Sequence, residues 1–324
     1  MRSSKLGTEI QRRLRCPVCQ ARLQLADDVC CCTRPECATS FPIVDGVPIL
    51  LNEAQSIFSI DDFVHRRDTT FHSHGGTLEE MVHGALRRLP TLSCSVGAEH
   101  NYARFGDSLL KLTAAPKVLI VGGSILGEGM KAFATNPAFE LIGTDVALGP
   151  LTTLVCDAHE IPFDDNSFDG VIAQAVLEHV VDPYRCVSEI HRVLKAGGLV
   201  YAETPFMQQV HMGRYDFTRF THSGHRRLFR DFDEVASGPI GGPGMALAWS
   251  WEYFLLSFTT SRVLRAVVRA FASVTAFHLK YFDYYLANKS PSVDAASGFY
   301  FIGQKAGRRL RDRELIRYYR GGLR

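Results

Sequence analysis

The chain has 324 residues, 46% of them hydrophobic and 22% charged, and its formal net charge at pH 7 is +2. This composition is typical of a globular protein with one large core or two unequal ones, and it gives no reason to expect nucleic-acid binding. No run of about 18 uncharged apolar residues and no apolar leader segment appears, so we expect a cytoplasmic protein without a membrane span.

Cysteines cluster near the start of the chain in two groups. A C-x-x-C pair comes first, and a second group that includes a C-x4-C pair follows. Two thiolate pairs joined by a short β-like excursion make a tetrahedral cage suited to zinc, whereas a redox C-x-x-C would need a βαβ context. We therefore expect a structural zinc ion whose ligands are Cys16, Cys19, Cys32 and Cys37, with Cys30 as the alternative third ligand.

This cysteine-rich segment resembles the zinc-ribbon modules of the small proteins that activate tRNA and protein methyltransferases. The stretch FPIVDGVPILL after the last cysteine of the group is similar to their YPI-x-DGIP-x-LL ending. The C-x4-C spacing and two additional thiols depart from that pattern. The resemblance implies that residues 1–51 form a zinc-ribbon module.

Residues 52–115 form the next segment, a linker followed by a helix predicted for EHNYARFGDSLLKL. The linker is rich in histidine but lacks the i, i+4 spacing of a helical metal site. We therefore assign no metal to its histidines, which are His65, His72, His74, His83 and His100.

From residue 117 onward, apolar strands alternate with helical patterns. Such alternation predicts an α/β fold with a parallel sheet and helices on both faces. The domain is expected over residues 116–306, with a helical insertion at about 241–297 and a basic tail at 307–324. The predicted strands are 117–123, 139–146, 152–159, 168–176, 199–206, 234–240 and 298–305, and the predicted helices include 127–136 and 182–198.

A glycine turn, GGSILGEG, lies between the first of these strands and the next helix. A phosphate-binding loop ends in Lys and Ser or Thr, but Glu128 and Gly129 stand at those positions. The G-x-G-x-x-G motif of dinucleotide-binding proteins is absent as well. Since Glu128 at a helix N-terminus would also repel a pyrophosphate, the ligand is not expected to be a polyphosphate.

Two carboxylates indicate a nucleoside instead. Asp145 ends the second strand, where it can accept hydrogen bonds from a ribose diol, and Asp157 ends the third, where it can reach an adenine amine. Either one alone could be a helix N-cap or a turn aspartate. Together, and in register with the glycine turn, they predict a nucleoside site.

The stretch VCDAHEIPFDDNSFDGVIAQAVLEHVVDPYRCVSEIHRVLKAGGLVYAETP resembles the class I S-adenosylmethionine methyltransferases of the ubiquinone/menaquinone-methyltransferase-like group, methyltransferase type 11. The resemblance spans residues 117–305 without the insertion. It implies a Rossmann-like, seven-stranded sheet and an S-adenosylmethionine cofactor. The cofactor-binding residues that it implies are Gly122, Gly123, Ser124, Asp145, Val146, Asp157, Ala158 and Gln174.

Two features depart from this family. Ile120 stands where the first motif usually carries an acid, and GGS replaces G-x-G. Since the acid helps to place the methionine amine or orders the loop, we hypothesise that Glu128 partly compensates for its absence.

Candidate catalytic residues gather just after the predicted strand 199–206, in TPFMQQVHMGRYDFTRFTHSGHRRLF. Methyl transfer from a sulfonium depends mostly on alignment, but a hydroxyl or protonated amine acceptor also needs a general base. Histidine suits that role near neutral pH. We expect a base, an orienting carboxylate and an anion clamp among His211, His222, Asp216, Arg219 and Tyr215.

Part of the same stretch has a structural alternative. THSGHRRLFRDF is also typical of a capped surface helix with Arg226, Arg227 and Arg230 in solvent, and that interpretation is favoured for these arginines and for His225. His179 in LEH is expected to be a packing residue at a helix start.

The insertion is predicted as two helices with aromatic and aliphatic residues on more than one face. Such a pair can form a lid over the acceptor pocket, a homodimer surface, or a peripheral contact with the inner face of a membrane. The basic tail carries seven arginines against two acids and is expected to be a solvated helix.

The predicted function is S-adenosylmethionine-dependent methylation, by O-methylation, of a small-molecule, glycan or lipid-linked acceptor. One alternative is RNA or protein methylation with the ribbon and the tail as docking surface, although AQAVLEH replaces the (N/D)PP(Y/F) motif of such enzymes. The other is a non-catalytic scaffold, against which the intact pair Asp145 and Asp157 argues.

Overall fold

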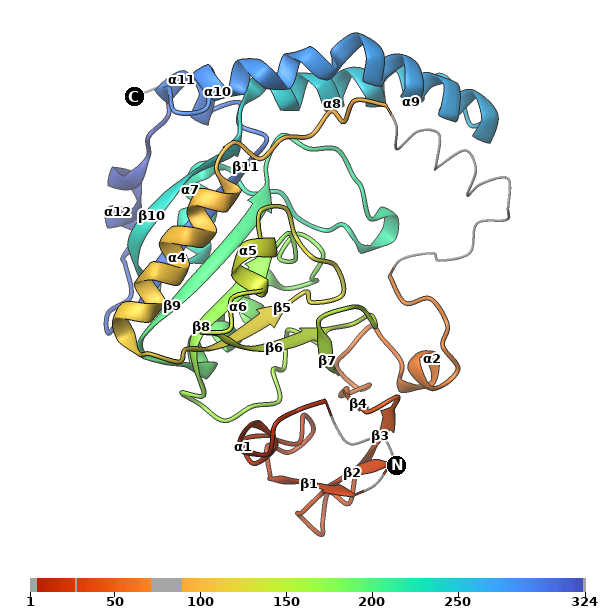
Figure 1. Ribbon diagram of the computed structural model, residues 1–324, viewed down its shortest axis with the longest axis vertical. Helices are drawn as coiled ribbons and strands as arrows, with labels where there is room; N and C mark the ends of the chain where they lie inside the picture. Colours follow the sequence, from red (N-terminus) through yellow and green to blue (C-terminus); the bar gives the residue numbers. More distant parts are fainter. Residues whose placement is uncertain (1–4, 27, 71–88, 323–324) are drawn as a thin grey trace.

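The computed structural model describes residues 5–26, 28–70 and 89–322 (Figure 1). Its centre is a sheet in the order β7-β6-β5-β8-β9-β11-β10. Neighbouring strands are parallel from β7 to β9, and β11 runs antiparallel to both β9 and β10. This arrangement confirms the predicted Rossmann-like sheet. The strands are β5 (Lys117–Val121), β6 (Glu140–Asp145), β7 (Thr152–Cys156), β8 (Phe168–Gln174), β9 (Leu194–Pro205), β10 (Phe232–Gly241) and β11 (Gly298–Lys305).

The cysteine-rich module extends this sheet at the β7 edge. After the short helix α1 (Thr8–Gln11), it forms the antiparallel strands β1 (Leu23–Ala26), β2 (Val29–Cys32), β3 (Ser40–Val44) and β4 (Val47–Leu50). Asp45 and Gly46 both have positive φ, 51° and 77°, as a two-residue hairpin turn of this hand requires. β4 then pairs in parallel with β7, so both units share one backbone hydrogen-bond network.

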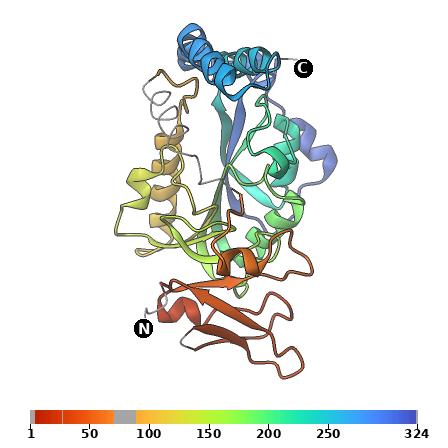
Figure 2. The same ribbon diagram turned by 90° about the vertical axis from the view of Figure 1, so that its right-hand side faces the viewer.

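Helices cover the two faces of the central sheet (Figure 2). α4 (Ala98–Leu112) and α5 (Lys131–Ala134) pack on one face through Tyr102, Phe105 and Phe133. α6 (Pro183–Val193) and α7 (His222–Leu228) cover the other face. Asp182 starts α6 by accepting a hydrogen bond from the amide of Arg185 (3.1 Å), and proline occupies the first turn.

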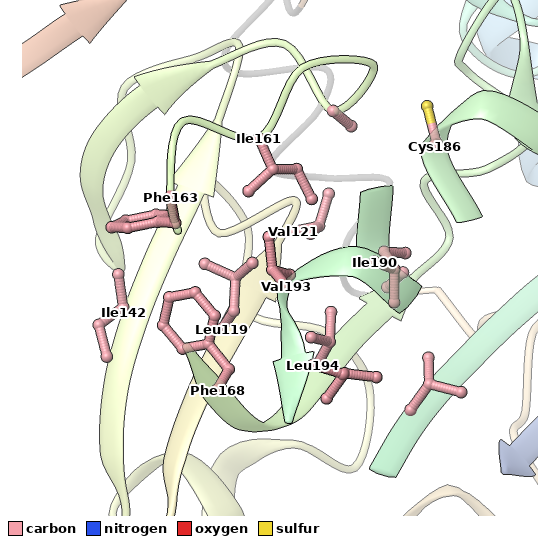
Figure 3. Close-up of a cluster of buried hydrophobic side chains, with 14 of the residues drawn as sticks. Leu119, Val121, Ile142, Ile161, Phe163, Phe168, Cys186, Ile190, Val193 and Leu194 are labelled. Carbon is pink, nitrogen blue, oxygen red and sulfur yellow. The ribbon is translucent and has the colours of Figure 1, made fainter. Parts of the chain in front are cut away.

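The larger core lies between α6 and the strands β5, β6 and β8 (Figure 3). Leu119, Ile142 and Phe168 project from the strands and Ile190 from α6, and each of these side chains is buried. Burial of each such side chain contributes about 1.5–3 kcal/mol. The core therefore holds the strand ends in fixed relative positions.

The insertion lies between β10 and β11 and is helical. Its long helices α8 (Pro243–Leu256) and α9 (Arg262–Ala276) run side by side along one end of the molecule (Figures 1 and 2). The buried carboxylate of Asp283 accepts the amide hydrogens of Gly244 (2.8 Å) and Met245 (2.9 Å), which caps α8. The rest consists of η2 (Phe277–Phe282), α10 (Asp283–Leu286) and α11 (Ser290–Val293). Within the described residues, no helix combines the length and apolarity needed to cross a membrane.

Several local predictions were wrong. The helix predicted for 127–136 is reduced to the four residues of α5, because Gly129 adopts φ of +77° and breaks the helical path. The helix predicted for 182–198 ends at Val193, and β9 begins at the next residue, Leu194. His72, His74 and His83 lie outside the described residues.

The basic tail is docked onto the domain, whereas a solvated helix was expected. It contains α12 (Asp312–Leu315) and η3 (Ile316–Tyr318). Arg309 pairs with Asp231 (2.7 Å), and Arg320 pairs with Glu234 of β10. The remaining short elements are α2 (Ile60–Val64) and η1 (Gly213–Tyr215).

Candidate active site

A cavity of about 310 Å³ opens at the carboxyl ends of β5, β6, β7 and β8. Parallel strands of an open α/β sheet bind their ligands at this edge. Seven of the eight residues implied by the family resemblance line the cavity, namely Gly122, Ser124, Asp145, Val146, Asp157, Ala158 and Gln174. Gly123 does not line it, because its amide donates to the carbonyl of Thr144 (3.0 Å) and it packs against the backbone of Gly143.

The glycine turn after β5 brings the backbone close to the cavity. Gly122 has φ of +88°, and a Cβ at this position would overlap the side chain of Val176. Only glycine fits both conditions. The amide of Ser124 then donates to Oδ2 of Asp145 (2.8 Å), which ties the turn to the end of β6.

The carboxylate of Asp145 is half-buried and accepts two backbone amides. Besides Ser124, the amide of Ala147 donates to its Oδ1 (3.0 Å). Burial raises the pKa of Asp145, although these backbone hydrogen bonds oppose the shift. An ionised carboxylate has about four acceptor positions, so the carboxylate keeps capacity for further donors such as the two hydroxyls of a ribose.

Asp157, at the end of the neighbouring strand, is held from two directions. The hydroxyl of Ser56 donates to its Oδ2 (2.6 Å), and the amide of His159 donates to its Oδ1 (3.0 Å). Burial alone would raise the pKa of Asp157, but the hydrogen bonds from His159 and Ser56 hold it below the ordinary value. The charged form is therefore stable at neutral pH.

The amide of Gln174 is fixed by a buried network. Tyr102 on α4 donates to its Oε1 (2.6 Å), and its Nε2 donates to Glu203 (2.9 Å) and to the carbonyl of Glu128 (3.0 Å). Burial raises the pKa of Glu203, which also accepts the hydroxyl of Tyr201. Gln174 therefore presents a fixed face to the cavity between β5 and β9.

The linker after the cysteine-rich module supplies part of the cavity wall, which the sequence analysis did not predict. Gln55, Ile57, Phe58 and Thr70 line it. The ring of Phe58 stacks on that of Tyr215, with centroids 5.7 Å apart. The wall therefore joins the linker to the segment that follows β9.

Of the five catalytic candidates, Tyr215 lines the cavity. His211 does not line it, but it contacts His179, which does. The Nε2 atoms of His179 and His211 are 3.0 Å apart. His179, which was expected to be a packing residue at a helix start, lies in the loop after β8 and lines the cavity directly. Its Nδ1 donates to the carbonyl of Tyr215 (2.8 Å), and burial lowers its pKa to about 4, which keeps the ring neutral.

A carboxylate and a guanidinium lie behind His211. Asp216 Oδ2 is 3.3 Å from its Nδ1 and accepts its backbone amide (2.9 Å). Arg219 holds Asp216 through both oxygens, with Nη2 to Oδ2 at 2.7 Å. The expected orienting role of Asp216 fits this arrangement, but Arg219 is committed to Asp216 and to backbone carbonyls, so the expected anion clamp is not supported.

His222 does not line this cavity, so the prediction that it is a general base was wrong. It packs on Phe299 and Tyr319, on the face covered by α7. His225 and Arg226 are buried there too, at 3% exposure each, which corrects the expected solvated position of both, whereas Arg227 is exposed and Thr221 caps the helix as expected. Burial, together with the nearby His222 and Arg226, lowers the pKa of His225 to about 3.

Glu128 does not take the role proposed for it in the cofactor loop. It is not among the cavity-lining residues, and its side chain accepts the amide of Ser95 (3.1 Å). Ile120 is buried in the core under α4. The loop is ordered by Asp145 and Thr144 instead.

The cysteine-rich module brings four sulfur atoms together. Those of Cys16, Cys19, Cys32 and Cys37 all lie within 4.8 Å of one another, with Cys19–Cys32 at 3.4 Å and Cys16–Cys37 at 3.9 Å. Four thiolates around zinc at about 2.3 Å stand about 3.8 Å apart, so this donor set fits the ion. Cys30 is buried in the hydrophobic core and is not part of the group.

Comparison with known proteins agrees with this geometry. Residues 125–202 match the family described as a methyltransferase domain. The chain is 29% identical over 123 residues to the ubiquinone/menaquinone biosynthesis C-methyltransferase UbiE of a Geobacter species, covering 33% of this chain and 52% of that protein. It is 39% identical over 94 residues to an uncharacterized methyltransferase of Mycobacterium tuberculosis, covering 26% and 38% of the two chains.

Among solved structures, the geranyl diphosphate C-methyltransferase of Streptomyces coelicolor, in complex with Mg²⁺, geranyl diphosphate and S-adenosyl-L-homocysteine, aligns with a TM-score of 0.41 and 12% identity. The alignment covers 73% of this chain and 86% of that one. The chain spans about half the length of the Geobacter relative, so the comparison concerns the domain that contains the cavity. The matched residues, 125–202, are thus similar to a methyltransferase domain, and they include most of the residues that line the cavity.

Proposed function

We propose that this chain is an active S-adenosylmethionine-dependent methyltransferase that O-methylates a small-molecule, glycan or lipid-linked acceptor. One observation carries the proposal: the glycine turn, Asp145 and Asp157 line a single cavity at the ends of adjacent strands. Two carboxylates that keep unfilled acceptor positions, next to a tight backbone turn, suit a nucleoside with an attached amino acid. A non-catalytic scaffold has no need of this arrangement.

The strand order suggests how the cofactor lies in the cavity. From β7 to β8, the order along the edge is Asp157, Asp145, Gly122 and Gln174. Adenine at Asp157 and ribose at Asp145 would direct the sulfonium toward Gln174 and the loop after β8. His179 and Tyr215 line the cavity beyond that point, which makes this end the acceptor side.

The chemistry needs little more than alignment. The acceptor oxygen attacks the methyl carbon as the carbon–sulfur bond breaks, and the electron pair of that bond remains on sulfur. A hydroxyl acceptor must also lose its proton. We assign that proton to the imidazole of His211, which Asp216 orients from behind.

Some of the similar proteins are named C-methyltransferases, so methylation of carbon is the alternative to O-methylation. Two measurements test the proposal, one after the other. Calorimetric titration of S-adenosylmethionine and S-adenosylhomocysteine into the zinc-loaded protein tests the cofactor site. Reaction of candidate acceptors with methyl-¹³C cofactor, followed by NMR, then distinguishes O-methyl from C-methyl products by chemical shift. No binding of either cofactor by the native protein would refute the proposal.

We further propose that the cysteine-rich module binds one structural zinc ion through Cys16, Cys19, Cys32 and Cys37. The close approach of the four sulfur atoms supports this ligand set and favours Cys32 over Cys30. The ion would hold the two hairpins of the module together, because a module of this size buries little core of its own.

The helix pair of the insertion supports a proposed peripheral contact with a membrane. Val263, Val267, Phe271 and Val274 are all more than half exposed and follow one stripe of α9. Leu247 and Phe254 on α8, and Phe258 just after it, are more than half exposed as well. α9 also carries Arg262, Arg265 and Arg269, and basic residues on such a helix favour the surface of an anionic bilayer.

Co-sedimentation with liposomes containing anionic lipid tests this contact. Phe258→Glu and Val267→Glu are expected to abolish pelleting, because each places a charge on the apolar surface. Leu112→Glu, at an exposed apolar position on α4, is the matched control and is expected to pellet like the native protein. No pelleting of the native protein, with a dimer in size-exclusion chromatography that Val267→Glu dissociates, would assign the surface to a second copy of the chain.

The docked tail argues against the RNA-directed alternative. Arg308 is paired with Glu314 (2.9 Å), and Arg309 and Arg320 with carboxylates of the domain. Each pairing removes positive charge that would otherwise be available to phosphates.

A further inference from the structure

Three side chains with metal-binding atoms converge next to the cavity, and one of them, His179, lines it. Glu178 and His179 lie in the loop after β8, and His211 comes from the segment between β9 and α7. One ligand atom from each lies within 4.8 Å of the others. The two Nε2 atoms are 3.0 Å apart, and Oε1 of Glu178 is 3.7 Å from Nε2 of His179.

The tautomer of His179 leaves its Nε2 without a proton. Its Nδ1 lies 2.8 Å from the carbonyl oxygen of Tyr215, which can only accept a hydrogen bond, so Nδ1 is the protonated nitrogen. The lone pair of Nε2 therefore points at His211. A backbone carbonyl on the other ring nitrogen is the usual partner of a metal-binding histidine.

His211 has a comparable arrangement. Oδ2 of Asp216 is 3.3 Å from its Nδ1, and Nη2 of Arg219 is 3.5 Å from the same atom. With the Nδ1 proton directed at the carboxylate, the Nε2 lone pairs of both rings face each other across 3.0 Å. Without a cation, the proton of His211 must instead lie on Nε2 and be donated to His179.

Glu178 supplies a second and independent observation. Its side chain is 1% exposed, and within the described part of the chain its Oε2 has no hydrogen-bond partner. The guanidinium of Arg219, whose charge acts on Glu178, is already paired with Asp216 through both oxygens. A buried carboxylate without a partner is costly unless a positive charge lies next to it.

We propose that Glu178, His179 and His211 bind one divalent first-row transition-metal cation at the acceptor end of the cavity. Two imidazoles and one carboxylate favour such a cation over magnesium or calcium, which prefer oxygen ligands. Metal–nitrogen bonds of about 2.1 Å at a right angle place the nitrogens about 3.0 Å apart, as they are here. The loops need little rearrangement to admit the ion.

The cation specifies the acceptor class of the proposed function, on which this inference rests. Three protein ligands leave coordination positions open, and His179 directs them toward the cavity. An acceptor with two adjacent oxygens, such as a vicinal diol or a catechol, would fill two of them. With the cation bound, His211 is a ligand and no longer the base, so the hydroxyl proton leaves to solvent instead of to His211 before the oxygen takes the methyl group.

Manganese is the probe for this site, because the thiolates of the zinc-ribbon cage prefer softer ions. MnCl₂ is titrated into the full, zinc-loaded chain while the EPR signal of free Mn²⁺ is followed. One tight site per chain is expected. Glu178→Gln and His211→Gln are each expected to weaken it at least tenfold, and His100→Gln, an exposed histidine on α4, is expected to leave it unchanged.

Thermal melting confirms that each variant is folded, and S-adenosylhomocysteine binding is measured on the same samples. Absence of a Mn²⁺ site in the native protein, or Mn²⁺ binding indifferent to both substitutions, would overturn the cation site. Such a result with S-adenosylhomocysteine binding intact leaves the proposed methyltransferase standing. If the native protein binds Mn²⁺ at this site but does not bind S-adenosylhomocysteine, the proposed function alone is refuted.

Discussion

The substitution Asp145→Asn tests the cofactor site most directly, because it keeps the size of the side chain. In the native protein each carboxylate oxygen already accepts one backbone amide, from Ser124 (2.8 Å) and Ala147 (3.0 Å). Each oxygen therefore retains one acceptor position for a ribose hydroxyl. The asparagine amide has a single oxygen, so its NH₂ group must face one of the two backbone donors and can no longer accept from the ligand.

The expected loss follows from the hydrogen bonds removed. One hydrogen bond to a charged group contributes about 1.5–3 kcal/mol, which corresponds to a loss of affinity of about 10- to 150-fold. Isothermal titration with S-adenosylhomocysteine measures it directly. Asp107→Asn on the exposed side of α4 is the matched control and is expected to bind like the native protein. Binding by a folded Asp145→Asn variant within threefold of native affinity would refute the assignment.

Three further substitutions test the zinc cage, the buried face of α7 and the cofactor loop. Cys37→Ser is expected to lower bound zinc to near zero by elemental analysis, whereas Cys31→Ser, at an exposed thiol outside the cage, keeps it. His225→Leu should flatten the pH dependence of unfolding: the folded pKa of about 3 lies below the ordinary 6.5, so native stability falls as pH drops from 6.5 toward 3, by about 1.4 kcal/mol per pH unit for this group. Chemical denaturation at pH 7 and pH 5 measures this slope, and an unchanged slope in the variant contradicts the reasoning. In Gly127→Ala, the added methyl group would overlap the side-chain amide of Gln174, which is expected to cost about 1–3 kcal/mol of stability. Gly307→Ala, where the methyl group meets open space, is the control and is expected to cost little. Equal melting temperatures of the two variants would count against the packing argument.

Much of the sheet could be predicted because its signals are local. The central strands are short and mostly apolar, and polar residues at or just after the ends of β6, β7 and β8, namely Asp145, Asp157 and Gln174, mark the ligand-binding edge. The register of Gly122, Asp145 and Asp157 follows from the parallel order alone, so these residues share one cavity as expected. The cysteine spacing likewise indicated the four-sulfur group, although only folding separates Cys32 from Cys30.

The acceptor side could not be predicted, because its contacts join segments far apart in the chain. His179 and His211 are 32 residues apart, and neither one alone distinguishes a site from packing. Phe58 reaches Tyr215 from the linker, which has no strand or helix pattern to fix its path. On α7, the arginine pattern suggested solvent, but Arg226 is buried and donates to the carbonyls of Phe229 and Phe232.

If the four cysteines bind zinc as proposed, the pairing of β4 with β7 would couple the metal content of the ribbon thermodynamically to the affinity for cofactor. Asp157 follows directly after β7, and Ser56, six residues beyond β4, donates to that carboxylate. Order that zinc imposed on β4 would therefore be shared with the part of the cavity that contains Asp157. By reciprocity, whatever factor zinc adds to cofactor affinity, cofactor adds to zinc affinity. The two units are one polypeptide, so dilution cannot separate them and this coupling would be independent of protein concentration. For an activator on a separate chain, the coupling would instead weaken on dilution.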